Sequence, residues 1–224
     1  MARPGPASRL ATEGRRSAAT RQVLVEAAVE TLSSEGFAGA SARTIAGRAG
    51  CNQALVFYHF GSVVGLLLAA LDSVSTMRLE RYSAAVEHVR SPAELVEVAA
   101  TIFREDMEAG YVTVLAEMIA GASSTPGLAA EVGARIAAWK QFAVQVIDRV
   151  FGSALGPLIP SDDLAYGAVA LYLGLELLSH LDGDRAQALN LFGHAKQVAS
   201  LAETFAAGAL PGGMASAPQR APRR

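Results

Sequence analysis

The chain has 224 residues, of which 51% are hydrophobic and 18% charged, so it is long enough to bury a core in one or two domains. This composition excludes a largely disordered protein. The single cysteine, Cys51, excludes an internal disulfide and cannot form a zinc site alone, which is typical of a reducing compartment.

No stretch has the features of an export signal or a clear membrane span. The first residues are polar and contain arginine, without the apolar core of a signal peptide. The most apolar stretch, 164–181, contains Glu176 and His180 and has aspartates at both ends, which favours a buried helix over a span. We therefore expect a cytoplasmic protein with no membrane partner.

The net charge of −2 is unevenly distributed along the chain. Residues 1–60 contain seven Arg and four Glu, residues 61–210 contain nine basic and seventeen acidic side chains, and residues 211–224 add three Arg. This distribution is expected of a nucleic-acid-binding module attached to an acidic body, although a solvated basic tail gives the same count.

The N-terminal part predicts a module of three helices. Residues 1–16 are rich in Pro, Gly, Ser and Arg and indicate a flexible basic arm. A helix is predicted from about Thr20 to Glu35, where Gly36 ends it. The whole module is expected to span residues 17–64.

The stretch 41–60 has the pattern of a helix-turn-helix. Ser41 can cap one short helix, Gly50 supplies a left-handed turn residue, and Asn52 can cap a second helix. Two helices of this length cannot bury a face alone, so they must pack against the preceding helix.

The rest of the chain is predicted to form a larger helical domain over residues 65–210. Apolar residues recur at helical spacing, and Ser91-Pro92-Ala93-Glu94 combines a capping serine, a proline at the first helical position and a glutamate three residues after the cap. Further helices are expected at 63–86, 92–108, 111–120, 128–151, 162–182 and 186–208. Residues 211–224 are expected to form a disordered tail, and no stretch predicts a strand, so the fold class is all-α.

The N-terminal module resembles the DNA-binding domain of the TetR family of bacterial transcriptional repressors. The resemblance covers residues 20–70 and rests on Glu35-Gly36-Phe37, Ser41, Ile45-Ala46, Ala49-Gly50, Tyr58-His59-Phe60 and Leu66-Leu67. It implies about nine helices, a homodimer, and a C-terminal domain that binds a small effector and thereby controls DNA binding.

Several residues of the helix-turn-helix are suited to contact DNA. An α-helix fits the major groove, where Arg43 can pair with a guanine and Gln53 with an adenine, and both positions match base-reading positions of the family. The predicted DNA-binding residues are Ser41, Arg43, Thr44, Asn52, Gln53, Ala54, Tyr58 and His59. Alternatively, Ser41, Thr44 and Asn52 cap helices, and His59 anchors its helix to the module.

Other side chains of this stretch are assigned structural roles. Val56, Phe57 and Phe60 are expected in the core, and Arg48 on a solvated face or near a phosphate. Two positions depart from the family pattern: Phe57 replaces a usual tyrosine and Val63 a usual lysine, both phosphate contacts in the family. Each lost cation removes about one released counterion from the salt dependence of DNA binding.

The C-terminal domain offers candidates for an effector pocket. They are apolar, aromatic or isolated acidic residues on several helices: Met107, Tyr111, Glu117, Met118, Trp139, Phe142, Tyr166 and Leu173. Each of them, taken singly, is more often plain core. Glu117, Glu176 and His180 are polar groups on apolar helices, which orient an effector or meet water or a partner subunit.

The last two predicted helices, 162–182 and 186–208, are candidates for a dimer interface. The first is apolar almost all round, and a soluble monomer would not expose such a surface. Two such helices from each subunit would form a four-helix bundle.

The sequence favours no enzymatic activity, cofactor or metal site. It has no Gly-rich phosphate loop or nucleophile elbow, its four histidines are scattered, and Glu105, Asp106 and Glu108 are interpreted as a solvated face. The sequence thus predicts a dimeric regulator that binds operator DNA, a repressor released by a small, largely apolar effector. The alternative is an all-α ligand-binding or protein-interaction dimer whose helix-turn-helix no longer binds DNA specifically.

Overall fold

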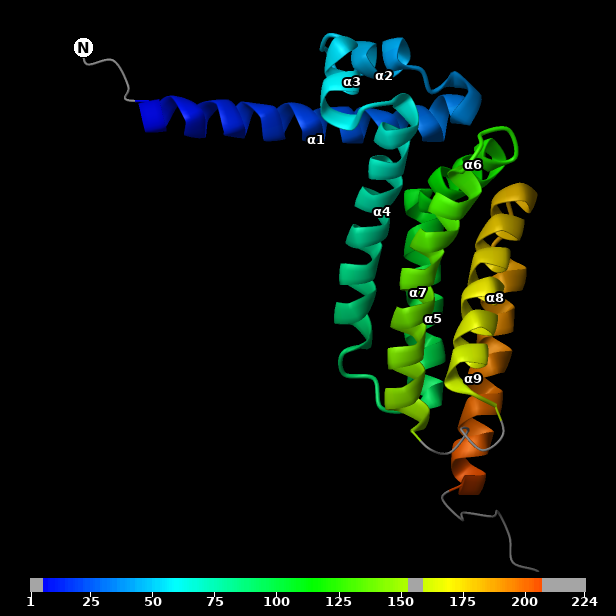
Figure 1. Ribbon diagram of the computed structural model, residues 1–224. Coiled ribbons are helices and arrows are strands. Elements are labelled where there is room, and N and C mark those ends of the chain that lie inside the picture. The colour runs from blue at the N-terminus through cyan, green and yellow to red at the C-terminus, as the bar shows by residue number, and fades with distance from the viewer. Residues whose placement is uncertain (1–5, 153–158, 207–224) are drawn as a thin grey trace, which may run out of the picture.

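The structure, a computed structural model, describes residues 6–152 and 159–206 and is all-helical over these ranges (Figure 1). The nine helices of this part of the chain are α1 (Pro6–Gly39), α2 (Ala42–Arg48), α3 (Ala54–Phe60), α4 (Val63–Val86), α5 (Pro92–Ala109), α6 (Tyr111–Ala122), α7 (Leu128–Phe151), α8 (Ser161–Asp182) and α9 (Ala186–Ala206). The prediction of an all-α fold is confirmed. The predicted tail, 211–224, lies outside the described residues.

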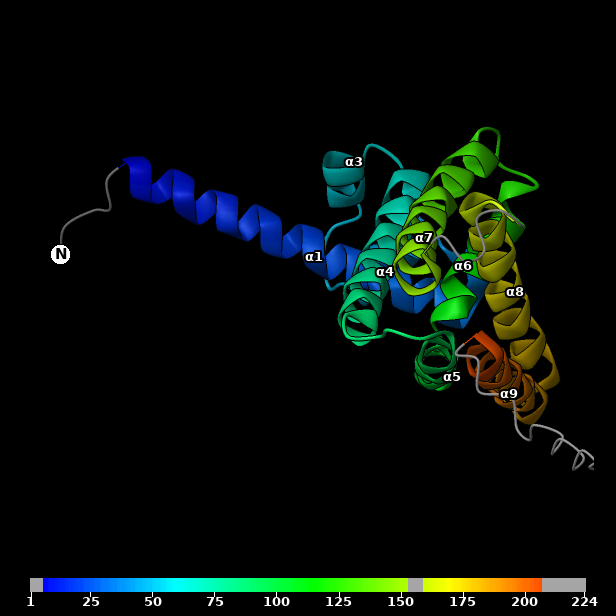
Figure 2. The same cartoon turned by 90° about the horizontal axis from the view of Figure 1, so that it is seen from below.

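Helix α1 begins much earlier than the sequence pattern predicts. It starts at Pro6 instead of about Thr20, so residues 6–16 are helical where a flexible arm was expected. Helix nucleation is costly but elongation is cheap, and an existing helix can extend through residues that show no apolar period. In both views the N-terminal half of α1 projects beyond the other helices (Figures 1 and 2).

Helices α1, α2 and α3 form a compact head. Gly36 interrupts α1 with a φ of 70°, as its predicted stop position requires. The Thr44 N–H donates to Ser41 Oγ at 3.1 Å, which caps α2. Fully buried side chains from the three helices and α4 form the core of this head: Leu24, Ala28, Leu32, Ile45, Val56 and Leu66.

Helix α4 leaves the head and runs the length of the body, and it belongs to both parts (Figure 1). Its first turn is capped by Ser62, whose Oγ accepts from the Gly65 N–H at 2.9 Å. The predicted start of α5 is also confirmed, because the Glu94 N–H donates to Ser91 Oγ at 3.3 Å. In both views α8 and α9 lie on the side of the body away from α4 (Figures 1 and 2).

The head and the body share one continuous core. Met118 of α6 and Leu128 and Val132 of α7 are buried in the same cluster as the head residues. The Phe37 N–H donates to Glu117 Oε2 at 2.8 Å, directly after the break in α1 at Gly36. These contacts couple the position of α6 to that of the C-terminal end of α1.

Helices α8 and α9 expose an unusually apolar surface. The large apolar side chains exposed there are Tyr166, Leu171, Leu177, Leu178, Leu181, Leu191, Val198, Leu201 and Phe205. By length and composition α8 could cross a membrane, and so could α3 with α4 if their 65° bend counted as one broken span. However, α8 also holds the fully buried Glu176, which forms an ion pair with Arg78 of α4. Such a pair fits a helix packed within a protein body.

Candidate functional site

Two exposed side chains of the helix-turn-helix have no partner within the part of the chain that the structure describes. They are Arg43 in the first turn of α2 and Gln53 just before α3. Both helices lie on the side of α1 away from the body (Figure 1). These two long polar side chains are therefore available to an external ligand such as a DNA base edge.

The smaller polar residues of this stretch form hydrogen bonds at the starts of α2 and α3. Ser41 Oγ lies 2.8 Å from Thr44 Oγ1, in addition to its bond from the Thr44 N–H. Asn52 Oδ1 accepts from the Ala54 N–H at 2.8 Å. Of the three residues for which capping was an alternative role, Ser41 caps α2, whereas Asn52 bonds to the first residue of α3, whose N-cap position is Gln53 without a side-chain cap bond.

The aromatic residues of α3 divide between the core and the surface. Val56 is fully buried and Phe60 half-buried, as expected, but Phe57 is 52% exposed, so its assignment to the core was wrong. One helix of two turns can turn only one side inward, and Val56 occupies it. Tyr58 is 78% exposed, and the half-buried His59 ring packs edge-on against it at 4.9 Å.

Arg48 is exposed, as expected of a residue on a solvated face, and it also links α2 to α1. Its Nη2 donates to Glu35 Oε1 at 2.8 Å and to Ser34 Oγ at 3.0 Å. The guanidinium is thus engaged by the end of α1 in a partly exposed contact.

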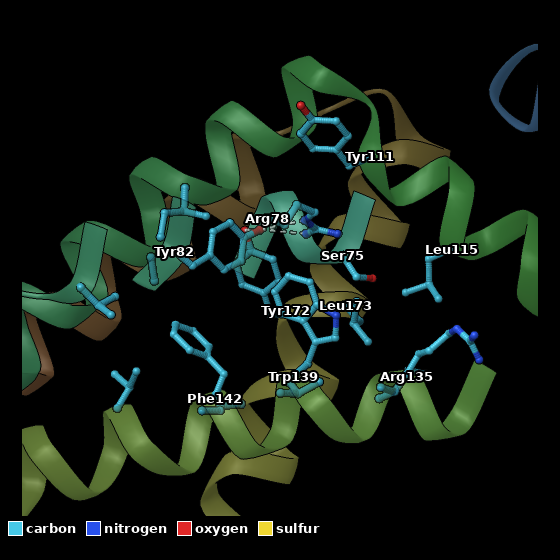
Figure 3. Close-up of a pocket in the computed structure, with 18 of the residues that line it drawn as sticks. Ser75, Arg78, Tyr82, Tyr111, Leu115, Arg135, Trp139, Phe142, Tyr172 and Leu173 are labelled. Atoms are coloured by element: carbon cyan, nitrogen blue, oxygen red, sulfur yellow. Dashed lines mark hydrogen bonds between the residues drawn. The ribbon is translucent and has the colours of Figure 1, made fainter. Parts of the chain in front are cut away.

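The body contains a cavity of about 220 Å³ between α4, α5, α6, α7 and α8 (Figure 3). Its wall is almost wholly apolar and aromatic. Four of the eight predicted pocket residues lie on this wall: Tyr111, Trp139, Phe142 and Leu173. That they bind an effector stays a prediction.

The other four predicted pocket residues lie elsewhere. Met107 packs with Phe103 against α9, and Met118 is fully buried in the core shared with the head. Glu117 accepts from Phe37 at the junction, and Tyr166 is 70% exposed on the outside of α8. Periodicity identifies an apolar face of a helix but not which neighbour that face meets.

An ionic cluster lies beside the cavity. Arg78 Nη2 contacts Asp106 Oδ2 at 2.8 Å and Glu176 Oε1 at 2.7 Å. These two ion pairs join α4, α5 and α8. Arg81 also pairs with Asp106. Asp106 and Glu176 are fully buried and Arg78 is 5% exposed. The expectation that Asp106 belongs to a solvated face was wrong, and Glu176 is buried against Arg78 of the same chain.

Two tyrosines complete the cluster. The Tyr172 hydroxyl donates to Asp106 Oδ2 at 3.0 Å, and Arg78 Nε and Nη2 donate to the Tyr82 hydroxyl at 3.1 and 2.9 Å. Burial, and to a lesser extent the negative charge of Asp106, raises the pKa of Tyr172 far above its ordinary value. Its hydroxyl therefore stays protonated and donates.

Burial also changes the protonation of the charged members. Burial raises the pKa of the Glu176 carboxyl to about 7, and the charge of Arg78 offsets only part of this effect. For Arg78 burial lowers the pKa, but the charges of Glu176 and Asp106 outweigh it, so its pKa is raised and it stays charged. Glu176 Oε2 is buried without a hydrogen-bond partner, which fits a carboxyl that takes up a proton easily.

Aromatic rings surround the guanidinium of Arg78. It lies 5.1 Å from the centre of the Trp139 ring and 5.6 Å from that of Tyr82. The Tyr82 ring packs edge-on against Trp139 at 5.3 Å. Figure 3 shows Arg78 beside Tyr82, with the hydrogen bonds between them as dashed lines, and Trp139 reaching toward them from α7.

Sequence reasoning missed the polar residues of this cavity: Ser75, Arg78, Tyr82, Arg135 and Tyr172. Arg78 had a signal, because it continues the apolar stripe of Leu71 and Val74 at helical spacing and so points inward. No pattern indicated its partners, which are 28 and 98 residues away in the chain.

Comparison with known proteins identifies the module and the fold. Residues 24–70 match the model of bacterial regulatory proteins, tetR family. Most of the chain is similar to solved structures of a transcriptional regulator of the TetR family from Cytophaga hutchinsonii (TM-score 0.69, 20% identity, 83% of this chain and 95% of that chain) and of the regulatory protein TetR from Rhodobacter sphaeroides (TM-score 0.64, 17% identity, 78% of this chain and 95% of that chain).

A third similar structure contains a ligand. It is the transcriptional regulator FadR from Bacillus subtilis in complex with stearoyl-CoA (TM-score 0.63, 12% identity, 79% of this chain and 96% of that chain). No curated protein matches the sequence. At these identities the similarity to solved structures establishes a shared fold over most of the chain, and the family model establishes the N-terminal domain.

Proposed function

Because the chain has the fold of TetR-family transcriptional regulators and residues 24–70 match that family's N-terminal domain, we propose that it is a homodimeric DNA-binding regulator. It acts as a repressor that a small, largely apolar effector releases from operator DNA. The observation that carries the DNA-binding part is the pair Arg43 and Gln53, exposed on the matched domain and without an internal partner in the described residues.

The cavity supports the effector part of the proposal. Its wall combines residues from five helices, including α4, α6 and α7, the three helices of the body that also pack in the head's core. A ligand that favours one arrangement of these helices would shift the population of head positions. In a dimer this shift changes the distance between the two reading heads, so that they no longer match two half-sites.

The apolar surface of α8 and α9 supports the dimer. Exposed leucines and aromatics are concentrated on these two helices, and a second copy of the same surface would cover them. Such an interface places two heads on one DNA duplex.

The rival function is a ligand-binding dimer that no longer binds DNA specifically. Phe57 and Val63 favour it, because the first is an exposed apolar ring on the reading head and the second packs against the core instead of offering a cation. Tyr58, which is also exposed, can supply one of the missing phosphate contacts.

Titration of the full-length protein against its own upstream promoter DNA separates the two functions. Fluorescence anisotropy at several salt concentrations should show tighter binding to this DNA than to random DNA of the same length. Arg43→Ala and Gln53→Ala should each weaken specific binding by roughly ten- to a hundredfold, since a bidentate base contact contributes about 1–3 kcal/mol.

Arg48→Ala is the matched control for these variants. It removes an arginine from the same helix, but one whose guanidinium is engaged with Glu35 and Ser34. Its specificity for the promoter over random DNA should be retained. Binding no tighter than to random DNA, with Arg43→Ala and Gln53→Ala without effect, would establish the rival function instead.

A further inference from the structure

Three hydrogen-bonding groups on the cavity wall have no partner within the residues that the structure describes. They are Nη1 of Arg78, the hydroxyl of Ser75 and the indole N–H of Trp139. All three can donate a hydrogen bond, and the arginine and tryptophan groups can only donate. These donors are therefore available to a ligand that carries a hydrogen-bond acceptor.

These groups border open space. Among the described residues, the side-chain atoms that are sealed without a partner are Glu176 Oε2 and Arg81 Nε, so none of the three is enclosed by protein. Arg78 is 5% exposed, and the space that it borders is the cavity. Figure 3 shows one nitrogen of Arg78 on the side away from Tyr82, toward Ser75.

Each cation of the site is already paired with carboxyl groups of the chain. Arg78 lies within 2.8 Å of both Asp106 and Glu176, and Arg81 pairs with Asp106. The second cation on the wall, Arg135, is held by Asp72 and Glu131. A ligand carrying a full charge would therefore enter a low-dielectric cavity whose cations are already paired, so it should bind more weakly than a neutral ligand of similar size.

We propose that the cavity binds a neutral, mainly apolar molecule that carries a carbonyl-type acceptor oxygen. The oxygen accepts from Arg78 Nη1, with Ser75 and Trp139 as neighbouring donors, and the apolar part packs among Tyr82, Trp139 and Phe142. The role of this molecule as an effector rests on the proposed function, whereas its chemical class rests on the cavity alone.

Four naphthalene probes of similar shape test this class on the wild-type protein by calorimetry. They are 2-acetylnaphthalene, 2-isopropenylnaphthalene, 2-naphthoate and 2-naphthylmethyl-trimethylammonium. The acetyl probe should bind about tenfold or more tightly than the isopropenyl probe, which has the same shape but no acceptor, since a charged donor makes a strong hydrogen bond. The two charged probes should bind more weakly than either.

The position of the probe can be read from a single signal. Trp139 is the only tryptophan of the chain, so its indole N–H gives one resonance in a ¹⁵N-edited NMR spectrum. Adding the acetyl probe should shift this resonance. An unshifted resonance, equal affinity for the two neutral probes, or tightest binding of a charged probe would overturn the proposal.

Two mild variants keep the ionic cluster intact. Ser75→Ala or Trp139→Phe should reduce the preference for the acetyl over the isopropenyl probe. Ser73→Ala, an exposed serine of the same helix, is the matched control and should leave the preference unchanged. An unchanged preference in both cavity variants would contradict the assignment of these donors.

The outcome is independent of DNA binding, because all of these measurements use the protein alone. If the acetyl probe is preferred but promoter DNA is not bound specifically, the ligand class stands and the regulator fails. If DNA is bound but no probe is preferred, the regulator stands and the ligand class fails.

Discussion

At the scale of single residues, Glu176 is an acidic side chain in an environment that disfavours its charged form. It is fully buried, one of its carboxylate oxygens has no partner, and its pKa is raised to about 7. Removing one partner of a buried ion pair leaves an uncompensated charge, but replacing a charge by a neutral group of the same shape need not cost stability. Glutamine in place of Glu176 can still accept from Arg78.

Glu176→Gln should therefore change how stability depends on pH. The pKa of Glu176 is higher in the folded state than in the unfolded chain, so its contribution to stability is fully present below about pH 4.5 and is lost as the pH rises through 7. Between pH 5 and pH 8, the free energy of unfolding of the wild type should fall relative to that of the variant by about 2–3 kcal/mol. Urea denaturation at several pH values measures this difference.

A surface variant provides the comparison for this experiment. Glu87→Gln removes an exposed carboxylate just after α4, and its stability difference from the wild type should stay nearly constant over the same range. A constant difference for Glu176→Gln as well would show that the buried carboxyl ionises as it does in the unfolded chain.

At the scale of elements, the contact between α1 and α6 joins the head to the body. Phe37 follows the break in α1, and its ring lies against the backbone of the buried Gly121 in α6. A Cβ on Gly121 would lie 2.4 Å from this ring, closer than any two carbon atoms can pack. Glycine at this position therefore lets the two helices approach.

Gly121→Ala should destabilise the protein by about 1–3 kcal/mol, because the added methyl group overpacks this contact. Gly133→Ala in α7 is the matched change, since its Cβ would meet nothing within 4 Å. That variant should be neutral or more stable by up to about 1 kcal/mol, as expected for alanine in an exposed helix. Thermal unfolding of the two variants compares them, and equal stability would show that Phe37 does not pack tightly on α6.

The elements themselves were largely predictable from local signals. Ser41, Ser91 and Gly36 act where the sequence places them, because a cap or a left-handed residue depends on a few neighbours in the chain. The start of α1 was not predictable in this way, because a helix that already exists extends through residues that would not nucleate one.

The candidate sites were predictable only in part, for a related reason. Arg43 and Gln53 lie on short helices whose exposed side follows from the apolar pattern. The cavity depends on which helices of the body are neighbours, and that is decided by tertiary packing. Arg78 could have been marked as inward-facing, but its pairing with Glu176 required the position of α8 relative to α4.

At the scale of the whole molecule, α8 and α9 expose large apolar side chains whose burial in an interface would stabilise an assembly. Leu181 is 71% exposed and Leu201 59% exposed, on helices whose other sides pack against the body. Each large apolar side chain that an interface covers contributes about 1.5–3 kcal/mol. A twofold interface repeats every such contact, so two substitutions in the chain remove four side chains from it.

The double variant Leu181→Glu with Leu201→Glu should accordingly be a folded monomer. Its mass in sedimentation or mass photometry should be 23.2 kDa, against twice that value for the wild type. Ile119→Glu, at an exposed apolar position of α6, is the control and should remain dimeric. The monomer should keep its helical content yet lose most of its affinity for promoter DNA, because one head contacts one half-site. A dimeric double variant would place the interface on another surface, and a monomeric wild type would remove the second head from the mechanism altogether.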